Sequence, residues 1–346
     1  MPGLLRIGRL DELPRKRLGH TPTPIEPMAN LSAAVGGASL SVKRDDCTGL
    51  ALGGNKVRQL EFYLGEALAQ GADTILITGA VQSNFVRTAA AAAAKCGLQC
   101  HVQLEERVAH PSDVYRVSGN VLLDRMLGAH IYSYPEGEDE AGADRRIGEI
   151  AEQLRSQGRR PYIVPLSPGH PPLGALGYVV AGAEVNAQLE QAGEHIDEVV
   201  VASGSGSTHS GLLFGLRAVG NPVPVTGACV RRNAALQAPR ITKMCQDIAD
   251  LLGMDNPVED ADVVVNDGVL APGYGTMNEA VGEAIRLAAR TEALIFDPVY
   301  TGRTMATALA RARAQPKGRR ILMIHTGGTP AIFAYEPELR PWLAEP

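Results

Sequence analysis

Short aliphatic segments alternate with helical patterns along most of the chain, and this alternation restricts the possible folds more than any other feature. Before position 170 the segments occupy residues 74–78, 100–104, 130–134 and 162–165. The helical patterns around them occupy residues 57–70, 85–95, 120–126 and 141–156. Strands that are apolar on both faces and are connected by helices form parallel sheets, which the helices cover. The pattern therefore predicts an α/β fold with mostly parallel, twisted sheets flanked by helices.

The same alternation resumes after a proline- and glycine-rich join at residues 167–172. A further strand is expected at 38–44, after a proline-containing opening segment, residues 1–36, that predicts an extended lead-in. The expected strands of the second series are 198–202, 223–230, 263–266 and 320–325, and its expected helices are 173–191, 211–218, 238–252 and 278–290. A chain of 346 residues with two such series is expected to form two domains or one large α/β unit.

Composition and charge exclude several classes of protein. The net charge of −5 argues against nucleic acid as the main partner. No run of 18 apolar residues occurs and the first twenty residues contain no apolar signal core, so we expect neither a membrane span nor export. The five cysteines are odd in number and show no Cys-x-x-Cys spacing, which predicts free thiols in the cytoplasm and no metal site.

Gly53-Gly54-Asn55-Lys56 places a lysine at the start of a predicted helix, directly after two glycines and an asparagine. Glycines allow a ligand to approach the backbone closely, and the start of a helix favours negative charge. A lysine in this setting can attack a carbonyl group if its amine is kept partly neutral. A solvated surface lysine would show the same local pattern, so the rest of the chain has to decide between the two interpretations.

A glycine- and serine-rich loop, residues 203–210, joins an expected strand to an expected helix. Exposed backbone N–H groups, hydroxyls and the start of a helix suit a phosphate. The loop is not a Walker loop, because no Gly-Lys-Ser/Thr follows, and the spacing of Gly204, Gly206 and Gly211 is too long for a dinucleotide fingerprint. Taken alone, it predicts either a phosphate site or a simple turn.

Further loops between strands and helices carry polar and aromatic groups. Ser83 and Asn84 either cap the next helix or offer donors to a substrate carboxylate. Tyr274 and Tyr300 each lie in a glycine-flanked loop, where a tyrosine fills a gap, stacks on a flat ring or passes protons. A reactive lysine, a phosphate loop, a carboxylate-sized polar turn and two loop tyrosines together indicate pyridoxal 5′-phosphate as the cofactor.

These motifs, taken in order, resemble the D-cysteine desulfhydrase and 1-aminocyclopropane-1-carboxylate deaminase family, which belongs to the tryptophan-synthase-β-like, fold-type II class of pyridoxal phosphate enzymes. The resemblance extends from about Thr21 to Phe333. Its most specific parts are Lys-Arg-Asp-Asp at 43–46, Gly-Gly-Asn-Lys at 53–56, Gln-Ser-Asn at 82–84, Leu-Gly-Ala-Leu-Gly-Tyr at 173–178 and Asp-Pro-Val-Tyr at 297–300.

The resemblance implies a role for each candidate residue. Lys56 would carry the cofactor and move the Cα proton of the substrate, and Asn84 would hold the 3′-oxygen of the ring. Ser83 would meet the substrate carboxylate, Tyr300 would stack near the ring, and Tyr274 would lie at the substrate. The remaining residues expected to bind the cofactor, most of them around its phosphate, are Asn55, Gly204, Ser205, Gly206, Ser207 and Thr208.

The resemblance also implies a domain arrangement and an assembly. Residues 60–170 would form a small domain, while residues 1–59 and 171–346 together would form a large domain that binds the cofactor. Members of the family tend to dimerise, so we expect a homodimer.

Two positions distinguish the branches of the family. Deaminases have glutamate after the second loop tyrosine and leucine after the late histidine, whereas this chain has Thr301 and Thr326. This difference favours the desulfhydrase branch, and we expect at least one of the two hydroxyls to face the ring nitrogen. Phe85 replaces the polar residue that usually follows Ser-Asn in the family, and residues 167–172 also depart from the desulfhydrase pattern. Cleavage of L-cysteate therefore stays an alternative.

The sequence thus predicts a cytoplasmic, pyridoxal-phosphate-dependent carbon–sulfur lyase that converts a small amino acid to pyruvate and ammonia. D-cysteine, which loses sulfide, is the leading substrate. The alternatives are an L-cysteate sulfo-lyase that releases sulfite, a 1-aminocyclopropane-1-carboxylate deaminase and a catalytically silent cofactor-binding protein. A dinucleotide-dependent oxidoreductase is disfavoured because no proper fingerprint follows a first strand.

Overall fold

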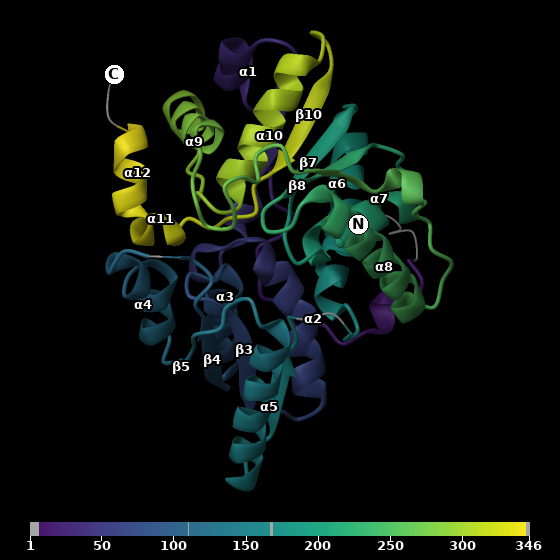
Figure 1. Ribbon diagram of the computed structural model, residues 1–346. Helices are drawn as coiled ribbons and strands as arrows, with labels where there is room; N and C mark the ends of the chain where they lie inside the picture. Colours follow the sequence, from purple (N-terminus) through teal and green to yellow (C-terminus); the bar gives the residue numbers. More distant parts are fainter. Residues whose placement is uncertain (1–6, 110, 167–168, 344–346) are drawn as a thin grey trace.

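The computed structural model describes residues 7–109, 111–166 and 169–343, so the first two residues of the proline- and glycine-rich join, 167 and 168, lie outside the described residues. The strands form one sheet of six and one of four. Figure 1 shows the larger sheet in the upper half of the molecule and the smaller sheet in the lower half, each with helices packed around it. The predicted α/β fold with mostly parallel sheets is confirmed.

The four-stranded sheet is parallel throughout, in the order β5-β4-β3-β6. Its strands are β3 (Thr74–Ala80), β4 (Gln99–Glu105), β5 (His130–Tyr134) and β6 (Pro161–Val164). The helices of this part of the chain are α2 (Asn55–Ala69), α3 (Asn84–Cys96), α4 (Gly119–Met126) and α5 (Glu140–Ser156). Every residue of β3 is buried, as expected for the aliphatic centre of a parallel sheet.

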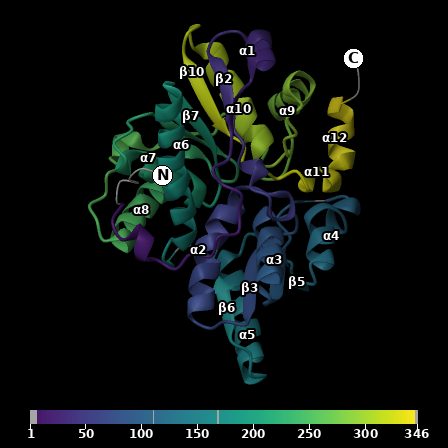
Figure 2. The ribbon, with the colours of Figure 1, turned by 180° about the vertical axis from the view of Figure 1, so that it is seen from behind.

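The six-stranded sheet has the order β1-β2-β10-β7-β8-β9, and only β1 runs antiparallel to its neighbour. Its strands are β1 (Ile25–Pro27), β2 (Ser39–Lys43), β7 (Glu198–Ser203), β8 (Val225–Cys229), β9 (Val264–Asn266) and β10 (Arg320–Ile324). The helices around it are α1 (Ala29–Val35), α6 (Leu173–Ala192), α7 (Ser207–Ala218), α8 (Ala234–Leu252), α9 (Glu279–Glu292), α10 (Thr301–Ala314), α11 (Ala331–Ala334) and α12 (Glu336–Leu343). The view from behind in Figure 2 shows β2, from the start of the chain, beside β10, from its end.

Two expectations about local structure were wrong, and one helix was not predicted. The opening segment is not simply extended, because it contains β1 and α1, and α1 buries Leu31. Residues 203–210 are not all loop, because α7 already begins at Ser207. The sequence also gave no prediction for α10, although its residues Thr301 to Leu309 are all buried.

Close packing of α2 on α6 explains the small residues of the Leu-Gly-Ala-Leu-Gly-Tyr motif. A Cβ atom at Gly177 would lie 2.2 Å from the carbonyl oxygen of Arg58, so only glycine permits this helix contact. α2 also crosses the predicted domain boundary at residue 60, although all four strands of the smaller sheet lie between residues 60 and 170. The two-domain division stays a prediction.

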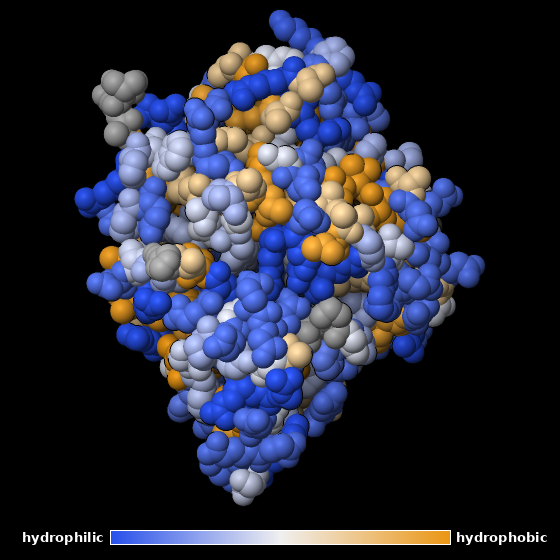
Figure 3. Space-filling model, viewed as in Figure 1, coloured by the Kyte–Doolittle hydropathy of each residue, from blue (hydrophilic) through white to orange (hydrophobic). Residues whose placement is uncertain are grey.

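Both sheets direct their carboxyl ends toward one cavity. The residues that line it include Ala80 at the end of β3, Arg107 after β4, Gly204 after β7, Val230 after β8 and Thr326 after β10. Loops at the carboxyl ends of parallel strands are where α/β proteins place their binding sites. On the face shown in Figure 3, hydrophilic residues lie across the middle of the molecule, where its two halves meet.

Candidate active site

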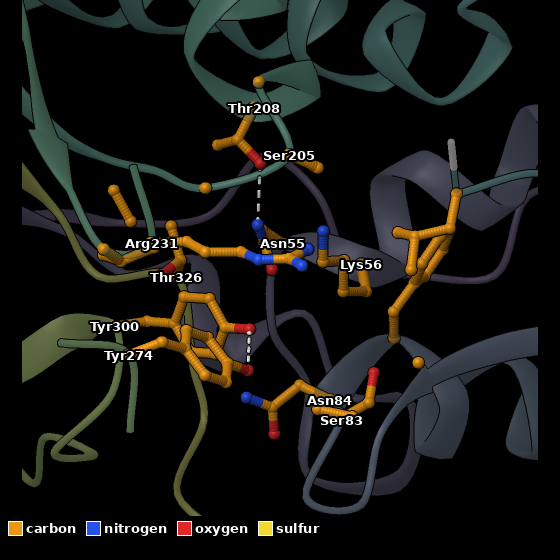
Figure 4. A pocket seen from close by; sticks show the side chains of 18 of the residues that line it. Asn55, Lys56, Ser83, Asn84, Ser205, Thr208, Arg231, Tyr274, Tyr300 and Thr326 are labelled. Atoms are coloured by element: carbon orange, nitrogen blue, oxygen red, sulfur yellow. Dashed lines mark hydrogen bonds between the residues drawn. The ribbon is translucent and has the colours of Figure 1, made fainter. Parts of the chain in front are cut away.

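Lys56 lies in the first turn of α2 and lines the cavity (Figure 4). Its Nζ is 3.2 Å from Oε1 of Gln59 and 4.8 Å from the centroid of the Phe85 ring. Burial lowers the pKa of the Lys56 amine from 10.5 to about 8. At pH 7 roughly one amine in ten is then neutral, instead of roughly one in three thousand for an ordinary lysine. The amine is thus suited to act as a nucleophile and as a base.

A buried network of charges fixes the start of α2. Nε of Arg58 donates to Asp45 at 2.9 Å, and Nη2 of the same residue donates to Glu184 on α6 at 2.9 Å. Lys43 adds a second cation, with its Nζ 2.6 Å from Glu184, and the hydroxyl of Tyr178 donates to Asp45 at 2.5 Å. The network joins β2, α2 and α6, so it holds Lys56 between the two sheets.

The loop after β7 presents the start of a helix to the cavity. Gly206 is the residue before the first turn of α7, has a φ of 109° and provides no side-chain cap, so the first backbone N–H groups of the helix have no capping side chain. The hydroxyl of Thr208 accepts hydrogen bonds from Asn55 at 2.8 Å and from Gln59 at 2.9 Å, which leaves its own proton for an acceptor. A helix start with free N–H groups and a hydroxyl favours an anion such as phosphate.

Ser83 is the residue before α3 and Asn84 is the first residue of that helix, and both line the cavity. The Ser83 hydroxyl caps α3 by accepting a hydrogen bond from the backbone N–H of Val86 at 3.2 Å. The side-chain oxygen of Asn84 accepts a hydrogen bond from Asn120 at 3.0 Å, which leaves the Asn84 amide nitrogen as a donor. The capping interpretation therefore holds for Ser83 and not for Asn84, and both residues still offer polar groups to a ligand.

The two loop tyrosines lie side by side opposite Lys56 (Figure 4). Their hydroxyls are 2.8 Å apart, and their rings meet edge to face at a centroid distance of 6.1 Å. Tyr300 is held by the buried carboxylate of Asp297, which accepts the backbone N–H groups of Val299 and Tyr300 at 2.9 Å each. The aspartate of the Asp-Pro-Val-Tyr motif thus places a tyrosine at the cavity.

Most of the predicted site residues line this one cavity, but Thr301 and Ser207 do not. The Thr301 hydroxyl donates to Asp297 at 2.7 Å inside the protein, whereas Thr326 lines the cavity. Of the two threonines, only Thr326 is therefore placed to meet a cofactor. Ser207 lines a neighbouring pocket together with His170 and Met244.

Sequence reasoning missed five charged residues in the lining, namely Arg107, Glu140, Arg231, Arg232 and Arg240. A usable signal exists for three of them. Arg107 lies two residues after β4, and Arg231 and Arg232 follow β8, so their positions after the carboxyl ends of parallel strands predict a place at the cavity. The arginine on α8 and the glutamate on α5 carry no comparable signal.

The residues present fit pyridoxal phosphate. The fold supplies a lysine amine of lowered pKa, an uncapped helix start beside a Gly/Ser loop, an asparagine donor and tyrosine rings around one space. The loop also requires glycine, because Gly206 has a left-handed φ and a Cβ at Gly204 would lie 3.0 Å from Val230. Among the residues that the structure describes, no cluster of potential metal ligands occurs, and no helix is long and apolar enough to cross a membrane.

Comparison with known proteins agrees with this chemistry. Residues 16–327 match the model of a family described as pyridoxal-phosphate dependent enzyme. The chain is 40% identical over 338 residues to D-cysteine desulfhydrase of Klebsiella pneumoniae subsp. pneumoniae, covering 97% of this chain and 100% of the relative. It is also 40% identical over 336 residues to D-cysteine desulfhydrase of Salmonella newport, covering 96% of this chain and 99% of that protein.

Solved structures show the same fold. A protein described as an ACC deaminase homologue superposes with a TM-score of 0.85 at 36% identity, covering 96% of this chain and 98% of that chain. O-ureido-L-serine synthase superposes with a TM-score of 0.65 at 20% identity, covering 96% of each chain.

Proposed function

The chain belongs to the family of pyridoxal-phosphate dependent enzymes, and we propose that it is a carbon–sulfur lyase that acts on D-cysteine and forms pyruvate, ammonia and sulfide. The observation that carries the proposal is the Lys56 amine, which lies in the same cavity as Ser83, Asn84 and the loop after β7 and has a pKa lowered to about 8. The 40% identity to D-cysteine desulfhydrases over nearly the whole chain supports the choice of substrate.

The residues of the cavity would hold the cofactor from several sides. The backbone N–H groups at the start of α7, with Ser205 and Thr208, would bind the phosphate. Asn84 would donate to the ring oxygen, Tyr300 would lie against the ring, and Thr326 is the candidate partner of the ring nitrogen. When bound, the cofactor supplies an electron sink that stabilises negative charge at the substrate Cα.

The protein's own groups would then orient the substrate and move its proton. Ser83 would bind the substrate carboxylate, and the Lys56 amine would take the Cα proton, because it is partly neutral at physiological pH. Tyr274 lies close enough to exchange a proton with Tyr300, and it would assist departure of the sulfur. A threonine near the ring nitrogen can only form a hydrogen bond, and this suits elimination of a good leaving group better than opening of a cyclopropane.

The proposal is tested by a pyruvate-release assay with the purified, cofactor-loaded protein on D-cysteine, L-cysteine, D-serine and β-chloro-D-alanine, with sulfide measured in parallel. We expect equal amounts of pyruvate and sulfide from D-cysteine. If β-chloro-D-alanine and D-cysteine both gave no pyruvate while the cofactor was bound, the assignment as a β-eliminating lyase would be wrong.

We further propose that the enzyme acts as a homodimer in the cytoplasm. Two observations support the assembly: α4 exposes Leu122 (48%) and Met126 (73%), and the adjacent α11 exposes Phe333 (64%). An exposed apolar surface of this kind is typical of a protein interface. The five free cysteines fit a reducing compartment. Light scattering of the wild type and of Met126→Lys would test the assembly, because a dimer formed through this surface should weaken in the variant.

A further inference from the structure

The cofactor role proposed for Asn84 depends on which end of its side-chain amide faces the cavity. The two ends have nearly the same shape, but the nitrogen donates hydrogen bonds whereas the oxygen accepts them. The oxygen accepts a hydrogen bond from Nδ2 of Asn120 at 3.0 Å, which turns the nitrogen the other way. In Figure 4 this nitrogen points toward Tyr274 and Tyr300, and the oxygen points away from them. Asn120 therefore determines which group of Asn84 faces the cavity.

Two neighbours leave Asn120 a single orientation. This residue lies in the first turn of α4 and is completely buried. Its side-chain oxygen accepts a hydrogen bond from Nε of Arg87 at 3.2 Å, and its nitrogen also donates to the backbone carbonyl of Gln82 at 3.1 Å. A charged guanidinium has only donors and a carbonyl only accepts, so a reversed amide would lose both hydrogen bonds. The donor end of Asn120 is thus directed to Asn84.

Arg87 is a fixed and charged donor. Its side chain is completely buried, and its Nη1 donates to the carbonyl oxygens of Ala51 at 2.6 Å and Gly53 at 3.0 Å. Burial lowers the pKa of the guanidinium from 12.5 to about 10, and the charge of Asp124 on α4 opposes this decrease. A group with this pKa stays protonated at pH 7, so Arg87 cannot accept a hydrogen bond. The order of donors and acceptors between α3 and α4 is therefore set by the protein itself.

We propose that Asn120 is a positioning residue for the cofactor, which holds the Asn84 amide so that an N–H group faces the ring oxygen. This inference rests on the proposed function, in which Asn84 binds that oxygen. Asn120 is not among the described residues that line the cavity, so it acts on the cofactor through Asn84 alone. An N–H group stabilises negative charge on the ring oxygen, whereas an amide oxygen would favour the protonated form of that oxygen. Asn120 thereby determines the charge of the ring oxygen.

Asn120→Asp tests this role because the side chain keeps its shape and loses its donor. The new carboxylate still accepts from Arg87, but it repels the oxygen of Asn84, so the Asn84 amide should turn over and present its oxygen to the ring. The readout is the absorbance spectrum of the cofactor-loaded enzyme at fixed pH without substrate. Its longer-wavelength band belongs to the anionic ring oxygen and its shorter-wavelength band to the protonated form. We expect the ratio of the protonated to the anionic form to rise at least about tenfold.

A second variant and a matched control accompany this change. Asn120→Ala removes the donor without adding an acceptor, so the Asn84 amide is left free to turn, and the same ratio should rise about two- to tenfold. In the control pair, Nδ2 of Asn221 donates to Oδ1 of Asn186 at 2.8 Å, and neither of these described residues lines the cavity. Asn221→Asp breaks the same kind of hydrogen bond there and should leave the spectrum unchanged.

The spectrum also separates this inference from the proposed function. The melting temperature of each variant shows whether it folds, and if Asn120→Asp does not fold, Asn120→Ala alone decides the question. A folded Asn120 variant that binds the cofactor with the wild-type ratio would refute the positioning role, and so would an equal change in Asn221→Asp. The proposed function would stand in both cases. A wild type that forms no lysine-bound cofactor would refute the proposed function and this inference together.

Discussion

Replacing Phe85 by glutamine is expected to raise the pKa of the Lys56 amine and to slow its reaction with the cofactor at neutral pH. The amine lies 4.8 Å from the centroid of the Phe85 ring, which is 6% exposed, and burial lowers the pKa of the amine from 10.5 to about 8. This difference increases the neutral fraction at pH 7 by roughly three hundredfold. Phe85 therefore helps to keep the amine reactive.

Two effects of the ring oppose each other. A cation–π contact stabilises the charged amine by about 0.5–2 kcal/mol, so its loss alone would lower the pKa by about one unit. Exclusion of water destabilises the charged amine, and the low pKa in the presence of the ring shows that this effect is the larger one. Glutamine brings an amide oxygen and water to the amine, so we expect the pKa to rise by about one to two units.

The assay follows the rate at which the apoenzyme takes up pyridoxal phosphate between about pH 6.5 and 10.5, through the absorbance of the lysine-bound cofactor. Wild type should show a midpoint near pH 8, because the amine reacts only when it is neutral. At pH 7 Phe85→Gln should react roughly tenfold more slowly than wild type for each unit by which the pKa of Lys56 rises. At high pH the two rates should become equal. Phe85→Leu keeps water out, so its midpoint should stay at or below that of wild type. An unchanged midpoint in the glutamine variant, or an equal rise in the leucine variant, would show that Phe85 does not lower the pKa of Lys56 by excluding water.

Four further substitutions test other parts of the site. Gly206→Val forces a side chain into a left-handed backbone beside the phosphate loop and should weaken cofactor binding in a titration of the apoenzyme, whereas Gly220→Val, at a left-handed position with open space around it, should not. Thr301→Glu places a carboxylate beside the buried Asp297 and should lower the melting temperature, while Thr326→Leu should lower turnover with little change in melting temperature. Asp297→Ala leaves three backbone N–H groups and one hydroxyl without their acceptor and should cost about 1–3 kcal/mol in the free energy of unfolding measured with urea, and equal stability would contradict the role assigned to it.

The alternation of strands and helices could be predicted from sequence because it depends on local periodicity. β3, α3, β5 and α6 lie within a few residues of their predicted positions. The start of α7 could not be predicted, because a Gly/Ser segment has low helix propensity and Ser207 is helical only in its tertiary setting.

The site was predictable where a motif is contiguous and unpredictable where it depends on long-range contacts. Lys56, Asn84 and the phosphate loop lie in short motifs, and they meet at the cavity. The contact of Arg231 with Glu140 joins residues 91 positions apart, and no local pattern records it. The hydroxyl of Thr301 turns away from the cavity because Asp297 supplies a buried acceptor, which sequence order alone did not reveal.

The most direct test of the account is to locate the lysine that carries the cofactor. The purified enzyme is treated with borohydride, digested, and analysed by mass spectrometry for a pyridoxyl group on each lysine-containing peptide. We expect a single modified peptide that contains Lys56, and we expect Lys56→Ala to show neither this peptide nor pyruvate release from D-cysteine. A pyridoxyl group on another lysine, or wild-type turnover in Lys56→Ala, would contradict it.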